Sequence, residues 1–322
     1  MKNILVTGGT GFAGTHLIAY LQSVLDLSEY QLHVTHFGNS LSEQFSNFDP
    51  RCLHQLDLQD PALVRELIKR VQPVQIYHLA AFASAGDSFA QAAHVINNNS
   101  SIQLYILDAV AESVPGARVL VVGSAEEYGI SEAGELPISE DHPFRPVNPY
   151  AVSKVTQDML GLSYVYSHHL DVVRVRPFNH TGEGQTPAFA IPAFASQIVA
   201  IEAGRQQELS VGNLDAKRDI SDVLDVVRAY YLVMTEGKTG EVYNIGSGQS
   251  WSMREIVDAL ISFAKVPISV VTDENRLRPS EIPEMTANIS RIRSLGWEPQ
   301  ISRDQTLQRV LNWWRSRENQ NK

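Results

Sequence analysis

The turn that follows the first apolar segment constrains the fold of this chain more than any other sequence feature. Ile4 to Thr7 form a short β-type run, and Gly8-Gly9-Thr10-Gly11-Phe12-Ala13-Gly14 follow at once. Glycines at positions 8, 11 and 14 allow a tight turn and let the backbone approach a pyrophosphate, while the N-terminus of the next helix offers free N–H groups. We therefore predict a strand, a phosphate-binding turn and a helix here, with a purely structural turn as the alternative.

Apolar runs alternate with helical stretches through the first half of the chain. Strands are expected at 4–7, 32–37, 76–81, 119–122 and 172–176, and helices at 16–25, 61–71, 102–111 and 150–168. Near-continuous apolar strands separated by helices are typical of a parallel sheet covered on both faces. The pattern predicts an α/β fold, a doubly wound parallel sheet of the Rossmann type.

Beyond Phe178 the pattern changes, and 322 residues favour two lobes over one compact core. Helices are expected at 198–203, 252–264 and 304–316, a strand at 208–211, and a frayed polar tail at 315–322. We predict a dinucleotide-binding domain over 1–178, to which 214–246 returns. A smaller α/β lobe over 179–213 and 247–322 would then bind the substrate.

Composition excludes several classes of protein. The 26 Lys and Arg against 36 Asp and Glu give a net charge of −10, so we expect no nucleic acid or anionic membrane as a partner. Cys52 is the only cysteine, which excludes an internal disulfide and a Cys-based zinc cluster and suits a reducing cytoplasm. No apolar run approaches the ~18 residues of a membrane span. We predict a cytoplasmic protein without a metal site.

The residues after the second strand bear on the choice of dinucleotide. The stretch from Val34 to Ser40 contains neither an acidic residue nor an arginine. A carboxylate there would bind the ribose 2′-hydroxyl of NAD and repel the 2′-phosphate of NADP, so its absence favours NADPH, with NADH as the alternative. Asp57 is a candidate for the adenine amino group, against a solvated loop aspartate. His36 and Leu58 are further candidates for the cofactor site.

Two groups suited to acid–base chemistry lie one helical turn apart. Tyr150 and Lys154 are separated by four residues and share a helix face. A nearby ammonium favours the phenolate and lowers the pKa of a tyrosine toward the working pH. Ser124 follows the apolar run 119–122, at the sheet edge where open α/β folds bind ligands, and its hydroxyl can donate to a carbonyl. The alternative for Tyr150 and Lys154 is an ordinary surface pair, and the alternative for Ser124 is a simple cap or turn residue.

These residues resemble the extended short-chain dehydrogenases/reductases that act on nucleotide sugars. The resemblance covers essentially the whole chain and rests on Gly8 to Gly14, His78 to Ala81, Ser124 to Gly129, Asn148 to Lys154 and Arg176 to His180. It implies a catalytic triad of Ser124, Tyr150 and Lys154, with Lys154 also holding the nicotinamide ribose and Asn99 as a supporting polar residue. It also implies cofactor contacts at Leu79, Ala80, Ala81 and Pro177, and a homodimer through the helices around Gln103 and Tyr150.

Two further stretches narrow the choice of substrate. Gly212 to Asp219 is similar to a stretch of GDP-mannose 4,6-dehydratases and GDP-4-keto-6-deoxy-D-mannose reductases, and Arg176 to Gly182 followed by Gln185 resembles the reductase version. The implied reaction reduces the C-4 keto group of the GDP-linked sugar to give GDP-D-rhamnose. Candidate substrate contacts are Ser124, Glu126, Asn179, Arg218, Arg278 and Glu281, where the arginines would neutralise the diphosphate.

Three alternatives remain open. Glu126 stands two residues after Ser124 and is the type of base that a 4,6-dehydratase needs. Another nucleotide-sugar epimerase or reductase is the second alternative. The third is a non-catalytic dinucleotide-binding protein on the same fold, because fold does not determine function.

Overall fold

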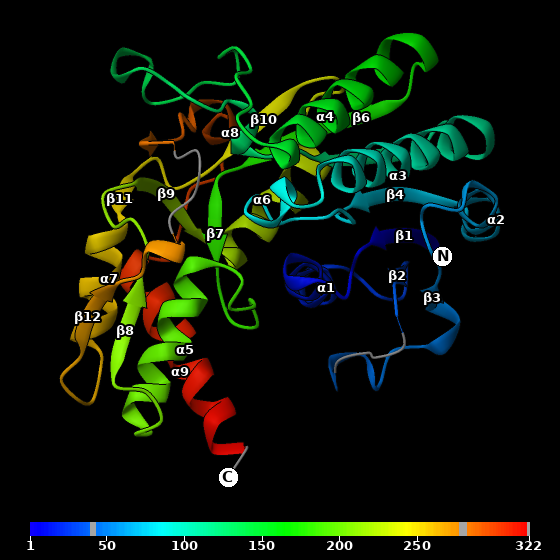
Figure 1. Ribbon diagram of the computed structural model, residues 1–322. Helices are drawn as coiled ribbons and strands as arrows, with labels where there is room; N and C mark the ends of the chain where they lie inside the picture. The colour runs from blue at the N-terminus through cyan, green and yellow to red at the C-terminus, as the bar shows by residue number, and fades with distance from the viewer. Residues whose placement is uncertain (39–42, 277–281, 321–322) are drawn as a thin grey trace.

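The larger part of the protein is built around one parallel sheet (Figure 1). The computed structural model describes residues 1–38, 43–276 and 282–320. The sheet contains β1 (Lys2–Thr7), β2 (Tyr30–His36), β3 (Leu53–Gln55), β4 (Pro73–His78), β5 (Arg118–Val122), β6 (Asp171–Pro177) and β10 (Val242–Ile245). Its order is β10-β6-β5-β4-β1-β2-β3, and every neighbouring pair is parallel. The order reverses between β1 and β4, which confirms the predicted doubly wound sheet.

Helices cover both faces of this sheet. On one side lie α1 (Phe12–Val24) and α6 (Val223–Glu236), and on the other α2 (Pro61–Val71), α3 (Ala92–Ser113) and α4 (Pro149–His168). Ile4 and Val6 of β1 belong to the core beside α1, whereas Leu5 belongs to the core beside α2 and α3. Burial on both faces explains why the strand reads as a continuous apolar run.

Local sequence accounts for most helix starts. The Asp60 carboxylate accepts from the N–H groups of Ala62 and Leu63, and the Asn148 side chain accepts from the Ala151 N–H. Each cap is followed by a proline at the first helical position, where no N–H is needed. By contrast, α3 begins ten residues before the predicted start. Its first turns hold an Asn/Ser-rich run of low helix propensity, and packing on α2 and α4 overrides that preference.

The second part of the protein has its own small sheets and core. The four-stranded sheet consists of β7 (Asn179–Thr181), β9 (Lys217–Asp222), β11 (Ser250–Ser252) and β13 (Glu284–Met285), and β8 (Glu208–Val211) pairs with β12 (Ser269–Thr272). Helices α5 (Ala190–Glu202), α7 (Met253–Ser262) and α9 (Arg303–Gln320) pack around Phe194, Ile256 and Leu307.

The C-terminal helix is longer than predicted. The prediction of a frayed tail from residue 315 onward is wrong, because α9 continues as a helix to Gln320. The Arg315 guanidinium holds this segment through hydrogen bonds of 2.6 and 2.9 Å to the Glu202 carboxylate and 2.8 Å to the Phe263 carbonyl.

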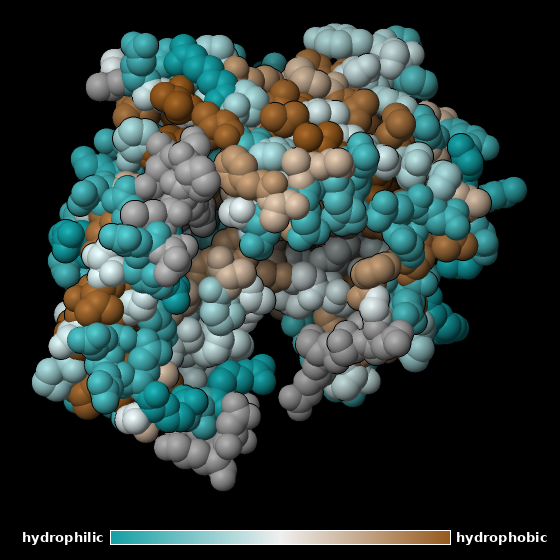
Figure 2. All heavy atoms as spheres, viewed as in Figure 1, coloured by the Kyte–Doolittle hydropathy of each residue, from teal (hydrophilic) through white to brown (hydrophobic). Residues whose placement is uncertain are grey.

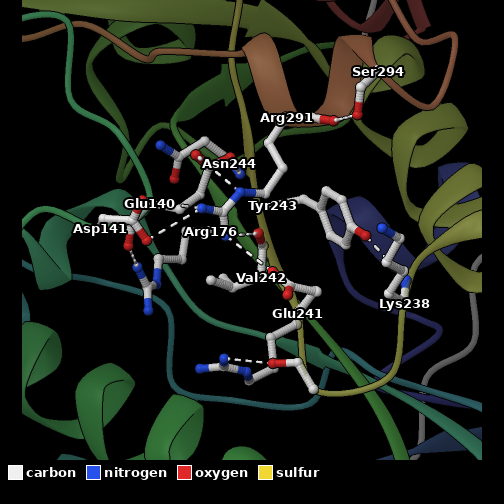
Figure 3. A network of polar contacts seen from close by, with 12 residues as sticks. Glu140, Asp141, Arg176, Lys238, Glu241, Val242, Tyr243, Asn244, Arg291 and Ser294 are labelled. Atoms are coloured by element: carbon white, nitrogen blue, oxygen red, sulfur yellow. Dashed lines mark hydrogen bonds and ion pairs between the residues drawn. The ribbon is translucent and has the colours of Figure 1, made fainter.

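A polar network (Figure 3) ties the edge strand β10 to the segment before α4 and to the short helix α8 (Ser290–Arg293). Arg291 of this helix forms ion pairs of 3.2 Å with both Asp141 and Glu241. The Glu140 carboxylate accepts the Asn244 N–H at 2.9 Å.

Within the described ranges, no helix is long and apolar enough to cross a membrane. Nor do three or more His, Cys, Asp or Glu side chains of those ranges form a group that could hold a metal ion.

Candidate active site

A cavity of about 1000 Å³ opens at the carboxyl edge of the large sheet, and Figure 2 shows the surface hollowed between the two parts of the protein. It collects residues that the sequence analysis assigned to the cofactor, the chemistry or the substrate. These are Gly8, Thr10, Gly11, Phe12, Ala13, Gly14, His36, Asp57, Leu58, Leu79, Ala80, Ala81, Ser124, Glu126, Tyr150, Lys154, Pro177, Asn179 and Arg218. The remaining two candidates, Arg278 and Glu281, lie outside the described residues.

Two glycines of the turn leave no room for a side chain of their own. Gly8 has a φ of +66°, and a Cβ on it would lie 2.8 Å from the Ala80 backbone. A Cβ on Gly14 would overlap the carbonyl oxygen of Gly8 and lie 2.7 Å from the Cα of Gly9. Gly11 caps α1 without a side-chain hydrogen bond, so the first N–H groups of the helix remain available to a ligand. The turn therefore fits a pyrophosphate.

The opposite end of the cofactor region is polar but carries no carboxylate at the end of β2 in the described residues. His36 Nδ1 donates to the Gly38 carbonyl at 3.2 Å. Asp57 is exposed, and its carboxylate accepts the Gln59 N–H at 2.9 Å, which orients it in the loop beside the cavity.

Ser124, Tyr150 and Lys154 come together at the middle of the cavity. The Ser124 and Tyr150 side chains are hydrogen-bonded to each other. Lys154 is 5% exposed, and its ammonium donates to the Val122 carbonyl at 2.9 Å and lies 5.8 Å from the centre of the Tyr150 ring. One helix and one strand end thus place a hydroxyl, a phenol and an ammonium side by side.

Burial dominates the protonation of these groups. Desolvation raises the pKa of Tyr150, while the hydrogen bond with Ser124 lowers it by less. The direction is opposite to the one predicted from Lys154 alone. Desolvation also lowers the pKa of Lys154 to about 8. At neutral pH the phenol is protonated and the amine carries its charge.

Asn99 lies behind the site rather than in the cavity wall. Its side chain accepts the Phe82 N–H at 2.7 Å and donates to the Phe82 carbonyl at 3.1 Å. It also donates to the Ser153 hydroxyl at 2.9 Å. Asn99 therefore joins α3, the loop after β4 and the turn of α4 between Tyr150 and Lys154.

The candidate substrate residues occupy different walls. Glu126 follows Ser124, and its carboxylate accepts from the Asn148 amide at 3.0 Å. Asn179 is exposed at the start of β7. The Arg218 guanidinium donates to the Ile282 carbonyl at 2.7 Å. The neighbouring Asp219 carboxylate accepts from the Ser247 and Gly248 N–H groups, and that of Asp222 accepts from Thr306 and Arg309.

Sequence reasoning missed several residues of the cavity. They are the loop after β4, the segment that leads into α5 with the first residues of that helix, and single positions on α6, α7, β13 and the short 3-10 turn Glu274–Arg276: Phe82 to Gly86, Thr186 to Phe194, Tyr230, Met253, Met285 and Arg276. Most are apolar residues of loops or helix ends. Neither periodicity nor a motif distinguishes such positions from ordinary core or loop residues.

Known proteins of similar sequence and structure show the family of the chain. The family model described as GDP-mannose 4,6 dehydratase matches residues 5–310. The GDP-6-deoxy-D-mannose reductase of Pseudomonas aeruginosa is 32% identical, with 98% of each chain covered. The solved structure of RMD from Pseudomonas aeruginosa complexed with NADPH superposes with a TM-score of 0.86 at 32% identity, covering 98% of this chain and 100% of that chain.

A dehydratase is also similar. The dTDP-glucose 4,6-dehydratase of Bacillus anthracis, solved in complex with NAD, is 25% identical with a TM-score of 0.83, covering 99% of this chain and 98% of that chain. Family match, identity and fold extend over nearly the whole length. The chain therefore belongs to the GDP-mannose 4,6 dehydratase family, within the extended short-chain dehydrogenases/reductases.

Proposed function

We propose that this protein is an NADPH-dependent reductase that converts GDP-4-keto-6-deoxy-D-mannose into GDP-D-rhamnose. One observation carries the proposal. Ser124, Tyr150 and Lys154 meet in one cavity with the glycine turn, in a chain 32% identical over its length to a GDP-6-deoxy-D-mannose reductase. The protein is accordingly an oxidoreductase acting on a nucleotide sugar.

The residues of the glycine turn fit a dinucleotide. The backbone from Gly8 to Gly14 would hold the pyrophosphate, and Lys154 the nicotinamide ribose, with Leu79 and Pro177 as further contacts. The lack of a carboxylate among the described residues at the end of β2, and the NADPH in the similar solved structure, favour NADPH over NADH. When bound, the reduced dinucleotide supplies the hydride that reaches C-4.

Tyr150 and Ser124 act on the oxygen of the C-4 carbonyl. Ser124 donates a hydrogen bond that polarises the carbonyl, and Tyr150 transfers its phenolic proton to the oxygen as the carbon is reduced. The raised pKa of Tyr150 suits this direction, because the group starts the reaction protonated. The Lys154 ammonium, charged below a pKa of about 8, stabilises the phenolate that remains.

The substrate side of the cavity binds the GDP-linked sugar. Arg218 and Arg278 neutralise the diphosphate, Asn179 binds a phosphate or sugar oxygen, and Glu281 accepts from a ribose hydroxyl. Glu126 positions a sugar hydroxyl, with its carboxylate held by Asn148.

The proposal divides these tasks between two parts of the chain. Residues 1–178 with 214–246 bind the cofactor, and 179–213 with 247–322 bind the nucleotide sugar. Two elements of 214–246 support its assignment to the cofactor part: α6 packs on the large sheet, and β10 is a strand of it. The strand β9, near the start of this range, pairs in the small sheet instead.

The protein acts as a cytoplasmic homodimer in this proposal. Along α4, Val152, Met159 and Tyr166 are 38%, 36% and 75% exposed, which supplies apolar surface for a second copy. Cys52 is an unpaired buried thiol, in keeping with a reducing compartment.

Turnover with a defined substrate tests the function. Freshly prepared GDP-4-keto-6-deoxy-D-mannose is mixed with enzyme and NADPH or NADH, cofactor oxidation is followed by absorbance, and the sugar is identified by NMR. Oxidation with formation of GDP-D-rhamnose supports the proposal. The C-4 epimer as product corrects the stereochemistry, and oxidation of neither cofactor overturns the proposal.

A GDP-mannose 4,6-dehydratase is the second candidate, favoured by the presence of Glu126 in the cavity wall. Such an enzyme removes a proton beside the keto carbon and causes no net oxidation of added cofactor. Conversion of GDP-mannose to the keto sugar, lost in Glu126→Gln, would establish it.

A further inference from the structure

Glu127 is a buried carboxyl group that lies directly behind the candidate active site. Glu127 is 0% exposed, and its Oε1 accepts the Ser124 N–H at 2.7 Å. Gly123 makes room for this contact, since a Cβ there would overlap Oε1. A carboxyl group thus fixes the backbone of the residue whose hydroxyl faces the cavity.

The other carboxyl oxygen of Glu127, Oε2, accepts no hydrogen bond. Glu127 Oε2 lies 3.2 Å from Arg176 Nε, yet it has no hydrogen-bond donor directed at it. Arg176 donates from Nε and Nη2 to Asp158 Oδ2, at 2.7 and 2.5 Å. Its Nη1 donates to the Tyr128 hydroxyl and to the Glu140 carbonyl, both at 2.9 Å (Figure 3 shows Arg176 beside Glu140).

Asp158 is the better-neutralised carboxylate of the pair. Besides the two bonds from Arg176, its Oδ1 accepts from Arg174 at 2.6 Å. Arg176 Nε lies 3.2 Å from Glu127 Oε2 and 2.7 Å from Asp158 Oδ2, so the two buried carboxyl groups are neighbours around one guanidinium. Adjacent buried carboxyl groups are favoured when one of them is protonated. Because both arginines donate to Asp158, the proton belongs on Glu127.

We propose that Glu127 is a positioning residue that keeps its proton at neutral pH, donates it to Asp158 and holds the Ser124 backbone through Oε1. The inference rests on the proposed reductase function for the reaction that Ser124 serves. Burial, followed by the charge of Asp158, raises the pKa of Glu127 well above the usual glutamate value, in agreement with the geometry.

A neutral Glu127 also determines the charge around the reacting groups. The titratable and charged groups that face it are Lys154, Tyr150 and Asp158 on α4, Arg176 on β6, and its chain neighbour Tyr128. An ionised Glu127 would raise the pKa of both Lys154 and Tyr150. Protonated, it leaves Lys154 free to serve as the counter-charge for the Tyr150 phenolate.

Two substitutions separate shape from charge. Glu127→Gln keeps an acceptor for the Ser124 N–H and a donor for Asp158 without a titratable proton, so kcat should stay within about threefold of wild type and the pH profile should keep both limbs. Glu127→Leu removes acceptor and donor, and kcat should fall on the order of 10- to 100-fold while the KM for NADPH changes little. Glu140→Gln and Glu140→Leu are the matched controls, because Glu140 is another buried glutamate whose carboxylate binds Asn244 instead.

Two readouts do not require turnover. In a wild-type minus Glu127→Gln infrared difference spectrum at pH 7, we expect the carbonyl stretch of a neutral carboxylic acid. Hydrogen exchange of the Ser124 amide, followed by NMR, should be slow in wild type and Glu127→Gln and fast in Glu127→Leu. If Glu127→Leu does not fold, the spectrum and the pH profile of Glu127→Gln still decide the inference.

Several results would overturn the inference. They are the absence of the carboxylic acid band, a Glu127→Gln variant as impaired as Glu127→Leu, or an alkaline limb displaced by about 1 pH unit or more in Glu127→Gln. Wild-type kcat in Glu127→Leu would also do so. A wild-type enzyme inactive on the GDP-linked keto sugar would contradict the proposed function, while the infrared and exchange measurements would still test Glu127.

Discussion

At the scale of single residues, the Tyr150 hydroxyl is the one proton donor that the proposed chemistry requires. Its partner in the structure is the Ser124 side chain. Tyr150→Phe removes the proton and little else, so we expect kcat to fall by about 10²- to 10⁴-fold with the NADPH dissociation constant nearly unchanged. Steady-state kinetics and cofactor fluorescence check this, with thermal unfolding as the control. Activity within tenfold of wild type would show that another group supplies the proton.

Lys154 is a residue for which function and stability conflict. Burial lowers its pKa from 10.5 to about 8, so the unfolded chain binds more protons between these values and stability rises with pH across that window. At pH 7 the folded protein carries the full cost, about 3 kcal/mol before the hydrogen bond to Val122 is counted.

Lys154→Met should therefore be inactive yet more stable than wild type at pH 7, by about 1–2 kcal/mol. The gain should shrink between pH 8 and 10.5 and vanish above 10.5, where the wild-type amine is neutral in both states. Urea unfolding across this pH range measures it, and Lys69→Met at an exposed site of α2 is the control. A stability difference that is independent of pH would contradict the assignment.

At the scale of elements, the turn between β1 and α1 depends on the contact of two backbones. A Cβ on Gly14 would overlap the Gly8 carbonyl, whereas one on Gly11 would lie 3.2 Å from the same oxygen. Gly14→Ala should lower stability by about 1–3 kcal/mol and weaken NADPH binding, because α1 must move away from the turn. Gly11→Ala is the matched variant with a smaller loss. Calorimetry and cofactor titration measure the two losses. If Gly14→Ala and Gly11→Ala lower the stability and the NADPH affinity equally, the close contact between Gly14 and the Gly8 carbonyl does not matter.

At the scale of the whole molecule, the cavity joins a cofactor region on the large sheet to a substrate region on the second part. A ligand that binds only the folded state stabilises it, by about 2.7 kcal/mol at 100 times its dissociation constant. NADPH and GDP should therefore each raise the Tm. In Arg218→Gln the shift caused by GDP should largely disappear while the shift caused by NADPH remains.

Arg254→Gln serves as the control, because Arg254 is exposed at the first turn of α7. Both shifts should survive in that variant. Loss of the NADPH shift in Arg218→Gln would mean that the two regions are not separate.

The sequence by itself determined what depends on neighbouring residues. The strand, glycine turn and helix from Lys2 to Val24 were predictable because a turn is encoded by adjacent positions. Tyr150 and Lys154 were predictable as a pair because four residues make one helical turn. Caps and prolines likewise set the start of α2 and α4.

Only the tertiary structure decided what depends on burial and on contacts between distant segments. The direction of the Tyr150 pKa follows from desolvation, which a sequence motif does not contain. The bond from the Ser124 N–H to Glu127 belongs to a capping box, a pattern that the local sequence can suggest. The position of Glu127 beside Arg176 of β6, by contrast, joins distant segments, and the local sequence does not show it. Local geometry is written in adjacent residues, whereas solvation and long-range pairing exist only once the chain has folded.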